Sequence, residues 1–378
     1  MTGRNILHLT TVHPREDTRI LYREVQSIAK SDTWKPSLVV ADGKGQQQRR
    51  FGNVDVTIYD IGRLPRGRLG RIVIGSYRAF RFVRSMRPSL VHFHDPEFIP
   101  AGLVLKILGA KVIYDVHEDL PKSIHDKYWV PVWMRFVLAW FVGFVELIGV
   151  RAFDGIVCAT PPIAARFSHR NMSIVQNFPI LDELGGHRSL QYKDRKEVFA
   201  YIGVLSERRG TYEMLEALNR LHDYPACRLE LAGMFRPLSF ERRMKRQPGW
   251  GRTTYHGQVT RQQISKLLER VRGGLVTLHP TPAYIDAYPV KLFEYMAAGL
   301  PVIASDFPLW RNIVREADCG LLVDPRDPGA IANAMRWILE NPEEAEEMGR
   351  RGRLAAIRKY NWATQEENLL SLYRKLPN

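Results

Sequence analysis

Short apolar runs alternate with longer amphipathic stretches along the first half of the chain. Strand-like runs are expected at Asn5–Leu9, Ser37–Ala41, Val54–Asp60, Ser89–Phe93, Lys111–Val116, Gly155–Ala159 and Ser173–Gln176. Apolar residues recur at helical spacing between them, at Ile20–Lys30, Arg71–Met86 and Phe98–Leu108, while Gln46–Arg50 is expected to be a brief polar loop. This alternation predicts a mostly parallel sheet with helices on both faces.

The second half repeats the pattern after a break. Segment Asn177–Lys196 contains Pro179, Gly185 and Gly186 and is expected to be a linker between domains. New strands are expected at Val198–Gly203, Arg228–Ala232, Thr253–His256, Gly274–Leu278, Pro301–Ser305 and Leu321–Val323. Helices are expected at Tyr212–Leu221, Arg261–Val271, Val290–Ala298, Gly329–Glu340, Pro342–Lys359 and Trp362–Leu376.

The predicted architecture is α/β, with two doubly wound, Rossmann-like domains facing across a cleft. A length of 378 residues favours two domains over one. We expect them at 1–180 and 197–359, with a terminal helix at 360–378 that crosses back to the first. Ligands of such sheets bind at the carboxyl ends of the strands.

The net charge of +15 suggests an anionic partner, such as nucleic acid, a membrane surface or a phosphorylated substrate. A soluble basic enzyme is the plainer explanation. Zinc-finger, helix-turn-helix and aromatic RNA-binding signatures are absent, which disfavours nucleic acid. Cys158, Cys227 and Cys319 are far apart and imply neither a disulfide framework nor a zinc site, which suits a reducing, cytoplasmic compartment.

The most apolar stretch of the sequence runs from Val130 to Val150. Arg135 and Glu146 interrupt it, leaving too short a clean run to predict a transmembrane helix. An aromatic and aliphatic stripe at helical spacing is formed by Trp133, Phe136, Val137, Trp140, Phe141, Phe144 and Ile148. The stripe fits a core helix or an interfacial helix that dips into a membrane. Basic clusters favour the membrane: Arg63, Arg66, Arg68 and Arg71, then Arg78, Arg81, Arg84 and Arg87.

The segment from Asp286 to Ser305 carries the most chemical information. Pro289 suits the start of a helix, and Gly299 followed by Pro301 ends it. The helix N-terminus would present free N–H groups and a positive dipole end to a phosphate. One turn further in, the Glu294 carboxylate could accept two hydrogen bonds from a ribose diol. The alternative is an ordinary amphipathic helix with Glu294 on its wet face.

The sequence KLFEYMAAGLPVIA, from Lys291 to Ala304, resembles the donor-site signature of retaining glycosyltransferases of the GT-B fold. These belong to the large group 1, family 4 type that builds bacterial polysaccharides. The resemblance implies that Glu294 binds the nucleotide ribose, and that Asp286, in place of the usual glutamate, faces the donor sugar. Tyr288, Pro289 and Val290 fall in the same donor-binding segment.

Other parts of the second half carry the same resemblance. YIGVLSERRG at Tyr201–Gly210 resembles the first strand, loop and helix of the family's C-terminal domain, and includes Gly203. The pyrophosphate-gripping lysine of the family falls on Arg209, which can still supply a bidentate cation, while the arginine falls on Val204. LELAG, ending at Gly233, matches the next strand and its glycine turn, and YHGQV at 255–259 matches the strand before the base-covering loop.

Polar clusters follow three strands of the first half. TTVHPREDTR at 10–19 lacks the glycine pair common in the family and resembles a subgroup with His13, Asp17 and Arg19 in this loop. VHFHDPE at 91–97 and IYDVHED at 113–119 supply three further candidates, which are His94, Asp95 and His117. The resemblance implies that His117 lies near the donor sugar and the acceptor. His92 alternates to the face opposite Phe93, which favours a structural role.

The resemblance therefore implies transfer of a sugar, with retention, from a UDP- or GDP-sugar to a saccharide acceptor in polysaccharide biosynthesis. Arg209, Lys291 and the helix N–H groups would stabilise the leaving diphosphate, so no metal or other cofactor is expected, nor any metal ligand. The apolar stripe and basic clusters favour a lipid-linked acceptor and an enzyme peripheral to the cytoplasmic face of an anionic inner membrane. The alternatives are a GT-B-fold sugar-nucleotide epimerase, an inactive nucleotide-sugar-binding subunit, or a nucleic-acid-binding protein.

Overall fold

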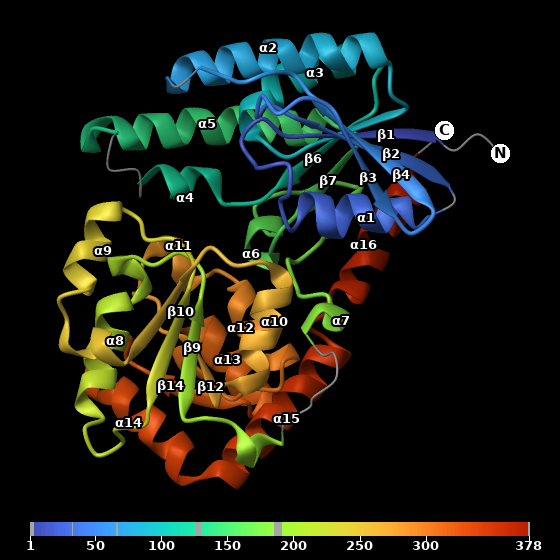
Figure 1. The fold of residues 1–378 in the computed structure, drawn as a ribbon. Helices are drawn as coiled ribbons and strands as arrows, with labels where there is room; N and C mark the ends of the chain where they lie inside the picture. Colours follow the sequence, from blue (N-terminus) through green and yellow to red (C-terminus); the bar gives the residue numbers. More distant parts are fainter. Residues whose placement is uncertain (1–3, 32, 66, 126–129, 185–190, 377–378) are drawn as a thin grey trace. The chain divides into compact units, whose positions relative to one another are not determined.

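The computed structural model describes residues 4–31, 33–65, 67–125, 130–184 and 191–376. Its contacts divide the chain into two compact units (Figure 1). Unit 1 contains residues 1–177 and 363–378, and unit 2 contains residues 178–362.

Unit 1 is built on an eight-stranded sheet in the order β3-β4-β2-β1-β5-β6-β7-β8. The strands are β1 (Arg4–Leu9), β2 (Trp34–Val40), β3 (Gln47–Phe51), β4 (Val54–Asp60), β5 (Leu90–Phe93), β6 (Val112–Val116), β7 (Gly155–Cys158) and β8 (Met172–Ile174). Every described pairing is parallel except β3 with β4. The parallel core agrees with the βα alternation of the sequence.

Helices cover both faces of this sheet (Figure 1). One face packs against α2 (Arg68–Met86), α3 (Ile99–Ile107) and α5 (Val132–Ala152), and a short α4 (Leu120–His125) lies against α5. The other face packs against η1 (Ile20–Val25), which continues as α1 (Gln26–Ala29), and against the C-terminal α16 (Trp362–Lys375). Short helical segments η2 (Pro96–Phe98) and α6 (Pro161–Ala164) complete unit 1.

Unit 2 has a six-stranded parallel sheet in the order β11-β10-β9-β12-β13-β14. Its strands are β9 (Val198–Ile202), β10 (Arg228–Ala232), β11 (Thr253–Gly257), β12 (Gly273–Val276), β13 (Val302–Ser305) and β14 (Gly320–Val323). Its main helices are α8 (Thr211–Arg220), α9 (Leu238–Met244), α10 (Arg261–Arg270), α12 (Val290–Ala297), α13 (Pro308–Ala317), α14 (Pro328–Glu340) and α15 (Pro342–Arg358). Shorter segments are α7 (Leu181–Leu184), η3 (Tyr192–Asp194), η4 (Glu207–Arg209), η5 (Pro248–Arg252) and α11 (Pro282–Ile285).

Two sequence predictions were wrong. The expected loop at 46–50 is largely strand β3, because its backbone pairs antiparallel with β4 at the edge of the sheet, where polar side chains face solvent. The expected linker is in part packed structure, because Phe178, Leu184 and Tyr192 are buried in the core of unit 2. Gly185 and Gly186 lie outside the described residues.

Each sheet contains a point where the strand order reverses. In unit 1, β1 lies between β2 and β5, and in unit 2, β9 lies between β10 and β12. The loops that follow the two strands flanking such a point diverge and leave a crevice at the carboxyl ends, which is where doubly wound sheets bind ligands. The predicted site residues follow β1, β5 and β6 in unit 1, and β9, β10 and β12 in unit 2.

Candidate functional site

Strand alternation places a polar cluster on one face of the unit 1 sheet. His8 on β1 is in register with His92 on β5, and His92 is in register with Ile113 on β6. Asp115 follows Ile113 by two residues and therefore lies on the same face. Phe93 points to the opposite face, into the apolar core. The prediction that His92 faces away from Phe93 is confirmed.

The centre of this cluster is a buried ion pair. Arg19 donates to both carboxylate oxygens of Asp115, at 3.0 to 3.2 Å, and its Nε lies 2.9 Å from Oε1 of Glu24 on η1. Although burial alone would raise the pKa of Asp115, Arg19 and the neighbouring histidines lower it well below its usual range. Burial and the Asp115 carboxylate raise the pKa of Glu24 well above its usual range. The two shifts have opposite directions and favour the negative charge on Asp115 over that on Glu24.

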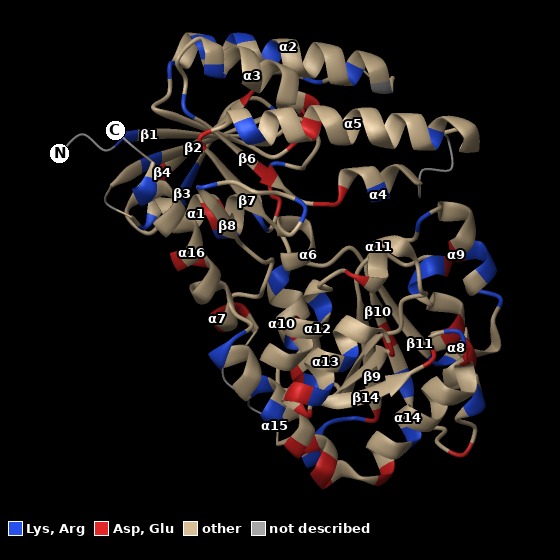
Figure 2. Ribbon diagram, turned by 180° about the vertical axis from the view of Figure 1, so that it is seen from behind, with Lys and Arg blue, Asp and Glu red and all other residues tan. Residues whose placement is uncertain are grey.

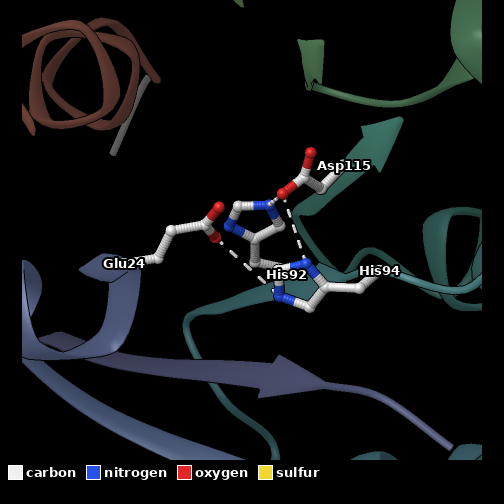
Figure 3. A group of neighbouring side chains, drawn as sticks. All are labelled: Glu24, His92, His94 and Asp115. Carbon is white, nitrogen blue, oxygen red and sulfur yellow. Dashed lines mark ion pairs between the residues drawn. The ribbon is translucent and has the colours of Figure 1, made fainter. Parts of the chain in front are cut away.

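Figure 3 shows how closely Glu24, His92, His94 and Asp115 approach one another, each offering a ligand atom within 4.8 Å of the others. Side chains of these types can bind a transition metal. Arg19 already bonds both carboxylates, and its guanidinium would repel a second cation in this buried space. The geometry is therefore accounted for by the arginine ion pair.

The imidazoles form a row of close contacts between ring nitrogens that runs from His117 into the protein. His117 Nε2 lies 3.1 Å from His94 Nδ1, and His94 Nε2 lies 3.0 Å from His8 Nδ1. The hydroxyl of Tyr373 on α16 then lies 3.3 Å from His8 Nε2 and 2.6 Å from His92 Nδ1. Burial lowers the pKa of His8 and His92, and lowers that of His94 to about 4, so these rings are neutral near pH 7.

A neutral imidazole has one donor and one acceptor, so the position of one ring proton determines the role of the other ring nitrogen. The Asp115 carboxylate lies 3.3 Å from His94 Nδ1 and 3.2 Å from His117 Nε2. Because hydrogen bonds to an ionised acceptor are the stronger ones, we assign both protons to these nitrogens, so that His94 and His117 each donate to Asp115 and not to one another. His8 then donates to His94, and Tyr373 donates to His8. The assignment leaves Nδ1 of His117 as a hydrogen-bond acceptor.

The remaining acceptor-side candidates surround His117. The rings of His13 and His117 are 5.0 Å apart, and His13 Nδ1 lies 3.2 Å from Asp17. Burial alone would lower the pKa of His13, but its hydrogen bond to Asp17 raises that pKa above its usual value. Asp95 accepts hydrogen bonds from the hydroxyls of Thr10 and Thr11 and from the backbone N–H of Thr11. Unit 1 thus brings together His13, Asp17, Arg19, His94, Asp95 and His117.

In unit 2, two basic side chains and a glycine meet at the end of β9. The Lys291 amine lies 3.7 Å from the centroid of the Tyr201 ring, and no described residue forms a hydrogen bond with it. A Cβ placed on Gly203 would lie 3.1 Å from that amine and 3.7 Å from a terminal nitrogen of Arg209. Burial and the neighbouring Arg209 lower the pKa of Lys291 well below its usual range. A buried, unpaired amine beside a guanidinium forms a site for an anion.

Gly203 and Gly233 allow two loops to approach closely. Both have positive φ angles, of 131° and 142°. A Cβ on Gly233 would lie 1.9 Å from the carbonyl oxygen of Gly203, so a side chain there would separate the loops after β9 and β10. Gly233 therefore shapes the loop that carries Gly203 through packing between backbones.

The environment of Glu294 differs from that of a residue on the wet face of an amphipathic helix. Its exposed fraction is 5%, so the wet-face alternative was wrong. Arg261, at the start of α10, donates to Glu294 Oε1 at 2.5 Å and to Glu183 Oε2 at 3.0 Å. The face of α12 that carries Glu294 therefore packs against α10 and α7 rather than facing open solvent.

The loop before α12 holds the other donor-side candidates. Asp286 is the exposed C-cap residue that follows the short α11, and Pro289 is the N-cap residue of α12. The Tyr288 ring stacks on Phe293 with centroids 6.2 Å apart, which points to a packing role, and Val290 is half-buried. Trp310 donates to the carbonyl of Ala287 at 2.7 Å and anchors the loop.

Helix α5 exposes the predicted aromatic stripe. Trp133, Phe136 and Trp140 have exposed fractions of 78%, 74% and 66%, so the core-helix interpretation was wrong. By length and composition the 21-residue helix could cross a membrane, although this is weak evidence by itself. Unlike these aromatic residues, Glu146 of the same helix is buried and forms a 2.7 Å ion pair with Arg166. Figure 2 shows arginines along the neighbouring α2 and few charges on α5. Arg66 and the Arg68 side chain lie outside the described residues.

Sequence reasoning missed several residues of these clusters. Strand alternation could have placed His8 and Asp115 beside His92. Nothing in the local pattern pairs Glu294 with Arg261, 33 positions away, or His92 with Tyr373, 281 positions away. These contacts depend on how helices pack on the finished sheets.

Comparison with protein families agrees with this arrangement. A model described as a glycosyl transferase 4-like domain matches residues 29–176, and one described as glycosyl transferases group 1 matches residues 186–355. The chain belongs to the group 1 glycosyltransferases. It is therefore a transferase that moves sugar residues, of class EC 2.4, as the donor-site signature predicted.

Two similar proteins transfer different sugars, as their names state. The D-rhamnosyltransferase WbpZ of Pseudomonas aeruginosa is 30% identical over 154 residues, which are 40% of this chain and 38% of that protein. The MMP alpha-(1->4)-mannosyltransferase of Mycolicibacterium hassiacum is 21% identical over 315 residues, or 79% of this chain and 74% of that one.

Solved structures confirm the GT-B fold of the glycosyltransferase. Sucrose-phosphate synthase from Thermosynechococcus elongatus matches with a TM-score of 0.76 and 17% identity, covering 99% of each chain. Anabaena HepE in complex with UDP-glucose matches with a TM-score of 0.71 and 14% identity, covering 99% of this chain and 100% of that one. At these identities the likeness concerns the fold alone.

Proposed function

We propose that this glycosyltransferase moves a sugar, with retention, from a UDP- or GDP-sugar to a lipid-linked saccharide acceptor during polysaccharide biosynthesis. The observation that carries the donor half is the buried, unpaired Lys291 amine beside Gly203 and Arg209. This is the environment that a nucleotide diphosphate needs, because the diphosphate supplies the missing negative charge. HepE, which shares the fold, is described in complex with UDP and with UDP-glucose.

The donor would be held by residues of unit 2. Lys291, Arg209 and the N–H groups at the start of α12 would bind the diphosphate and stabilise the charge that grows on it as the sugar–phosphate bond breaks. Arg261 orients the Glu294 carboxylate through Oε1, and we assign the ribose hydroxyls to Oε2. Asp286 would lie on the side of the donor sugar. With two cations on the leaving group, the transfer requires no divalent metal.

His117 is the residue we assign to the reacting hydroxyl. Its Nε2 donates to Asp115, and the remaining nitrogen of the neutral ring can accept a hydrogen bond from a sugar hydroxyl. Arg19 and Asp115 keep the ring oriented without touching the sugar. His117→Gln should lower turnover by roughly 10²-fold or more, a typical effect of a misplaced acid–base group. Affinity for UDP or GDP should stay unchanged, because the nucleotide is assigned to unit 2.

The exposed apolar face of α5 supports action at a membrane surface. Four large aromatic residues of this face are more than half exposed, while Gly149 and Glu146 attach the opposite side of the helix to the rest of unit 1. A helix attached to the protein along one side would lie in the interface rather than cross the bilayer. The arginines of α2 would attract an anionic cytoplasmic leaflet.

Donor hydrolysis tests the chemistry directly. Purified protein should bind either UDP or GDP and slowly release it from one matching nucleotide sugar. Addition of a lipid-linked saccharide should accelerate release, and NMR of the product should show the anomeric configuration of the donor. Binding without release under any acceptor condition would support an inactive binding subunit, and isomerisation of the free donor would support an epimerase.

Vesicle co-sedimentation tests the membrane assignment. The protein should sediment with anionic vesicles at low salt and less at high salt, because surface charges are screened within about 8 Å at physiological ionic strength. Phe136→Asp should weaken this binding, whereas Ile357→Asp, which changes an exposed residue of unit 2, should not. Equal recovery in the supernatant with neutral and anionic vesicles would contradict the assignment.

A further inference from the structure

Arg261 of α10 carries a buried hydrogen-bond donor that the chain leaves unused. Its Nε donates to Glu183 of α7 at 3.0 Å, and its Nη1 donates to Glu294 of α12 at 2.5 Å. Its Nη2 is buried and forms no hydrogen bond within the described part of the chain. Because a buried charged donor without a partner is unfavourable, this third nitrogen points to an acceptor atom that a ligand supplies.

The first turn of α10 holds this guanidinium in place. Thr260 and Gln263 form a capping box, in which each side chain accepts a hydrogen bond from the backbone N–H of the other residue. Arg261 lies between them, and α10 and α12 lie side by side in unit 2 (Figures 1 and 2). The unused donor is therefore fixed beside the Glu294 carboxylate before any ligand binds.

The surrounding charges decide which kind of atom can meet Nη2. A guanidinium nitrogen only donates, so the ligand atom must be an acceptor. A phosphate or carboxylate oxygen would add negative charge beside Glu183 and Glu294, whose two carboxylates already outnumber the single charge of Arg261. A hydroxyl is neutral, and it can accept from Nη2 while it donates to a carboxylate oxygen. Because Nη1 and Nη2 are neighbours in a planar fork, such a hydroxyl would lie next to the Glu294 carboxylate.

We propose that Arg261 donates through Nη2 to a hydroxyl of the donor's ribose diol, an inference that rests on the proposed transfer from a nucleotide sugar. The hydroxyl accepts from Arg261 and donates to Oε2 of Glu294, so the diol is recognised by a donor and an acceptor together. A nucleotide that lacks this hydroxyl leaves a buried guanidinium nitrogen and a carboxylate oxygen unpaired. Sites built to hydrogen-bond a hydroxyl strongly reject analogues without it. Arg261 is thus a specificity-determining residue, which makes the donor site select an intact ribose.

Calorimetry with deoxynucleotides tests this contact. The probe is UDP or GDP, whichever the wild-type protein binds, together with its 2′-deoxy and 3′-deoxy forms. The wild-type protein should bind the ribonucleotide at least about tenfold more tightly than one of these forms. Arg261→Gln should weaken binding of the ribonucleotide about tenfold and change that of the same deoxy form by less than about threefold, so that the preference is lost. Arg270→Gln is the matched control, because Arg270 lies at the other end of α10 in an ion pair with Glu230, and it should leave all these affinities unchanged.

A double variant separates direct contact from positioning. Direct contact predicts that Glu294→Gln alone keeps part of the ribose preference and that Arg261→Gln combined with Glu294→Gln loses it. If Arg261 only orients Glu294, these two proteins should show the same preference, and that result would overturn the proposal. The double variant removes both charges of the Arg261–Glu294 pair together, so it serves if Arg261→Gln alone fails to fold.

The wild-type protein distinguishes failure of this inference from failure of the proposed transfer. Equal affinities for the ribonucleotide and both deoxy forms would overturn the role of Arg261. Nucleotide binding and hydrolysis of the donor in the same preparation would show that the proposed transfer survives that result. A wild-type protein that binds neither UDP nor GDP and hydrolyses no donor would instead defeat the proposed transfer, and this inference with it.

Discussion

The hydroxyl of Tyr373 on the last helix lies 2.6 Å from Nδ1 of His92 in the middle of the unit 1 sheet. Both side chains are fully buried, and the same hydroxyl reaches His8 at 3.3 Å. The C-terminal helix therefore ends the hydrogen-bonded chain that runs from His94 through His8 to Tyr373. Tyr373 acts through other residues, so its effect on the reaction would be one of positioning.

Tyr373→Phe should separate this role from simple packing. Loss of the hydroxyl leaves two buried ring nitrogens without a partner, which costs about 1–3 kcal/mol of unfolding free energy for each. The tautomers of His8 and His92 should become mixed, and ¹⁵N NMR of the histidine rings reports this directly. A variant with reduced stability but unchanged histidine spectra would show that the hydroxyl only fills space.

Lys291 should make nucleotide binding depend on pH. Its pKa is lowered in the free protein by burial and Arg209, and a bound diphosphate would raise it again. Binding of UDP or GDP should therefore take up a proton, and affinity should fall as the pH rises through the free-protein pKa of Lys291. Calorimetry in buffers of different ionisation enthalpy measures the uptake. The Lys291→Arg variant stays charged and should bind the nucleotide without taking up a proton. Equal proton uptake by the wild-type protein and this variant would exclude Lys291 as the group that is protonated.

Glu294→Gln should weaken nucleotide binding about tenfold, or about 1.4 kcal/mol, by removing the charge that the ribose would contact. It should also lower stability, because Glu294 is buried in an ion pair with Arg261. Glu183→Gln is the matched control, since it removes the other partner of Arg261 at a more exposed position. Calorimetry and urea unfolding measure both effects. Equal loss of nucleotide affinity in the two variants would assign the effect to Arg261 rather than to the ribose contact.

Unit 1 should lose stability in mild acid. Burial lowers the pKa of His94 from 6.5 to about 4, so the unfolded chain binds this proton at a higher pH than the folded one. The contribution of the neutral His94 ring to the free energy of unfolding is complete above about pH 6.5 and is lost as the pH falls toward 4. The free energy of unfolding then falls by up to roughly 1.4 kcal/mol per pH unit for each such ring. Urea unfolding between pH 7 and 4 should show this slope. His94→Gln should flatten this slope, whereas His222→Gln, which changes an exposed histidine of unit 2, should not. Identical slopes in the wild-type protein and both variants would contradict the prediction.

The sequence by itself determined the two βα series and the family, because strand and helix periods and the donor-site signature are local. Val54–Asp60 and Arg228–Ala232 form strands with the predicted bounds. Alternation also determined that His92 and Phe93 face opposite sides of the sheet, since a strand repeats every two residues.

Only the tertiary structure decided which partners these side chains meet. The same amphipathic pattern fits a helix with Glu294 facing water or facing Arg261, and the packing of α10 against α12 selects the second. The apolar stripe of α5 fits a core or a surface equally well, and the fold leaves Trp133 and Phe136 exposed. Tyr373 meets His92 because the last helix packs on the sheet built from the first residues, a contact that depends on every element between them.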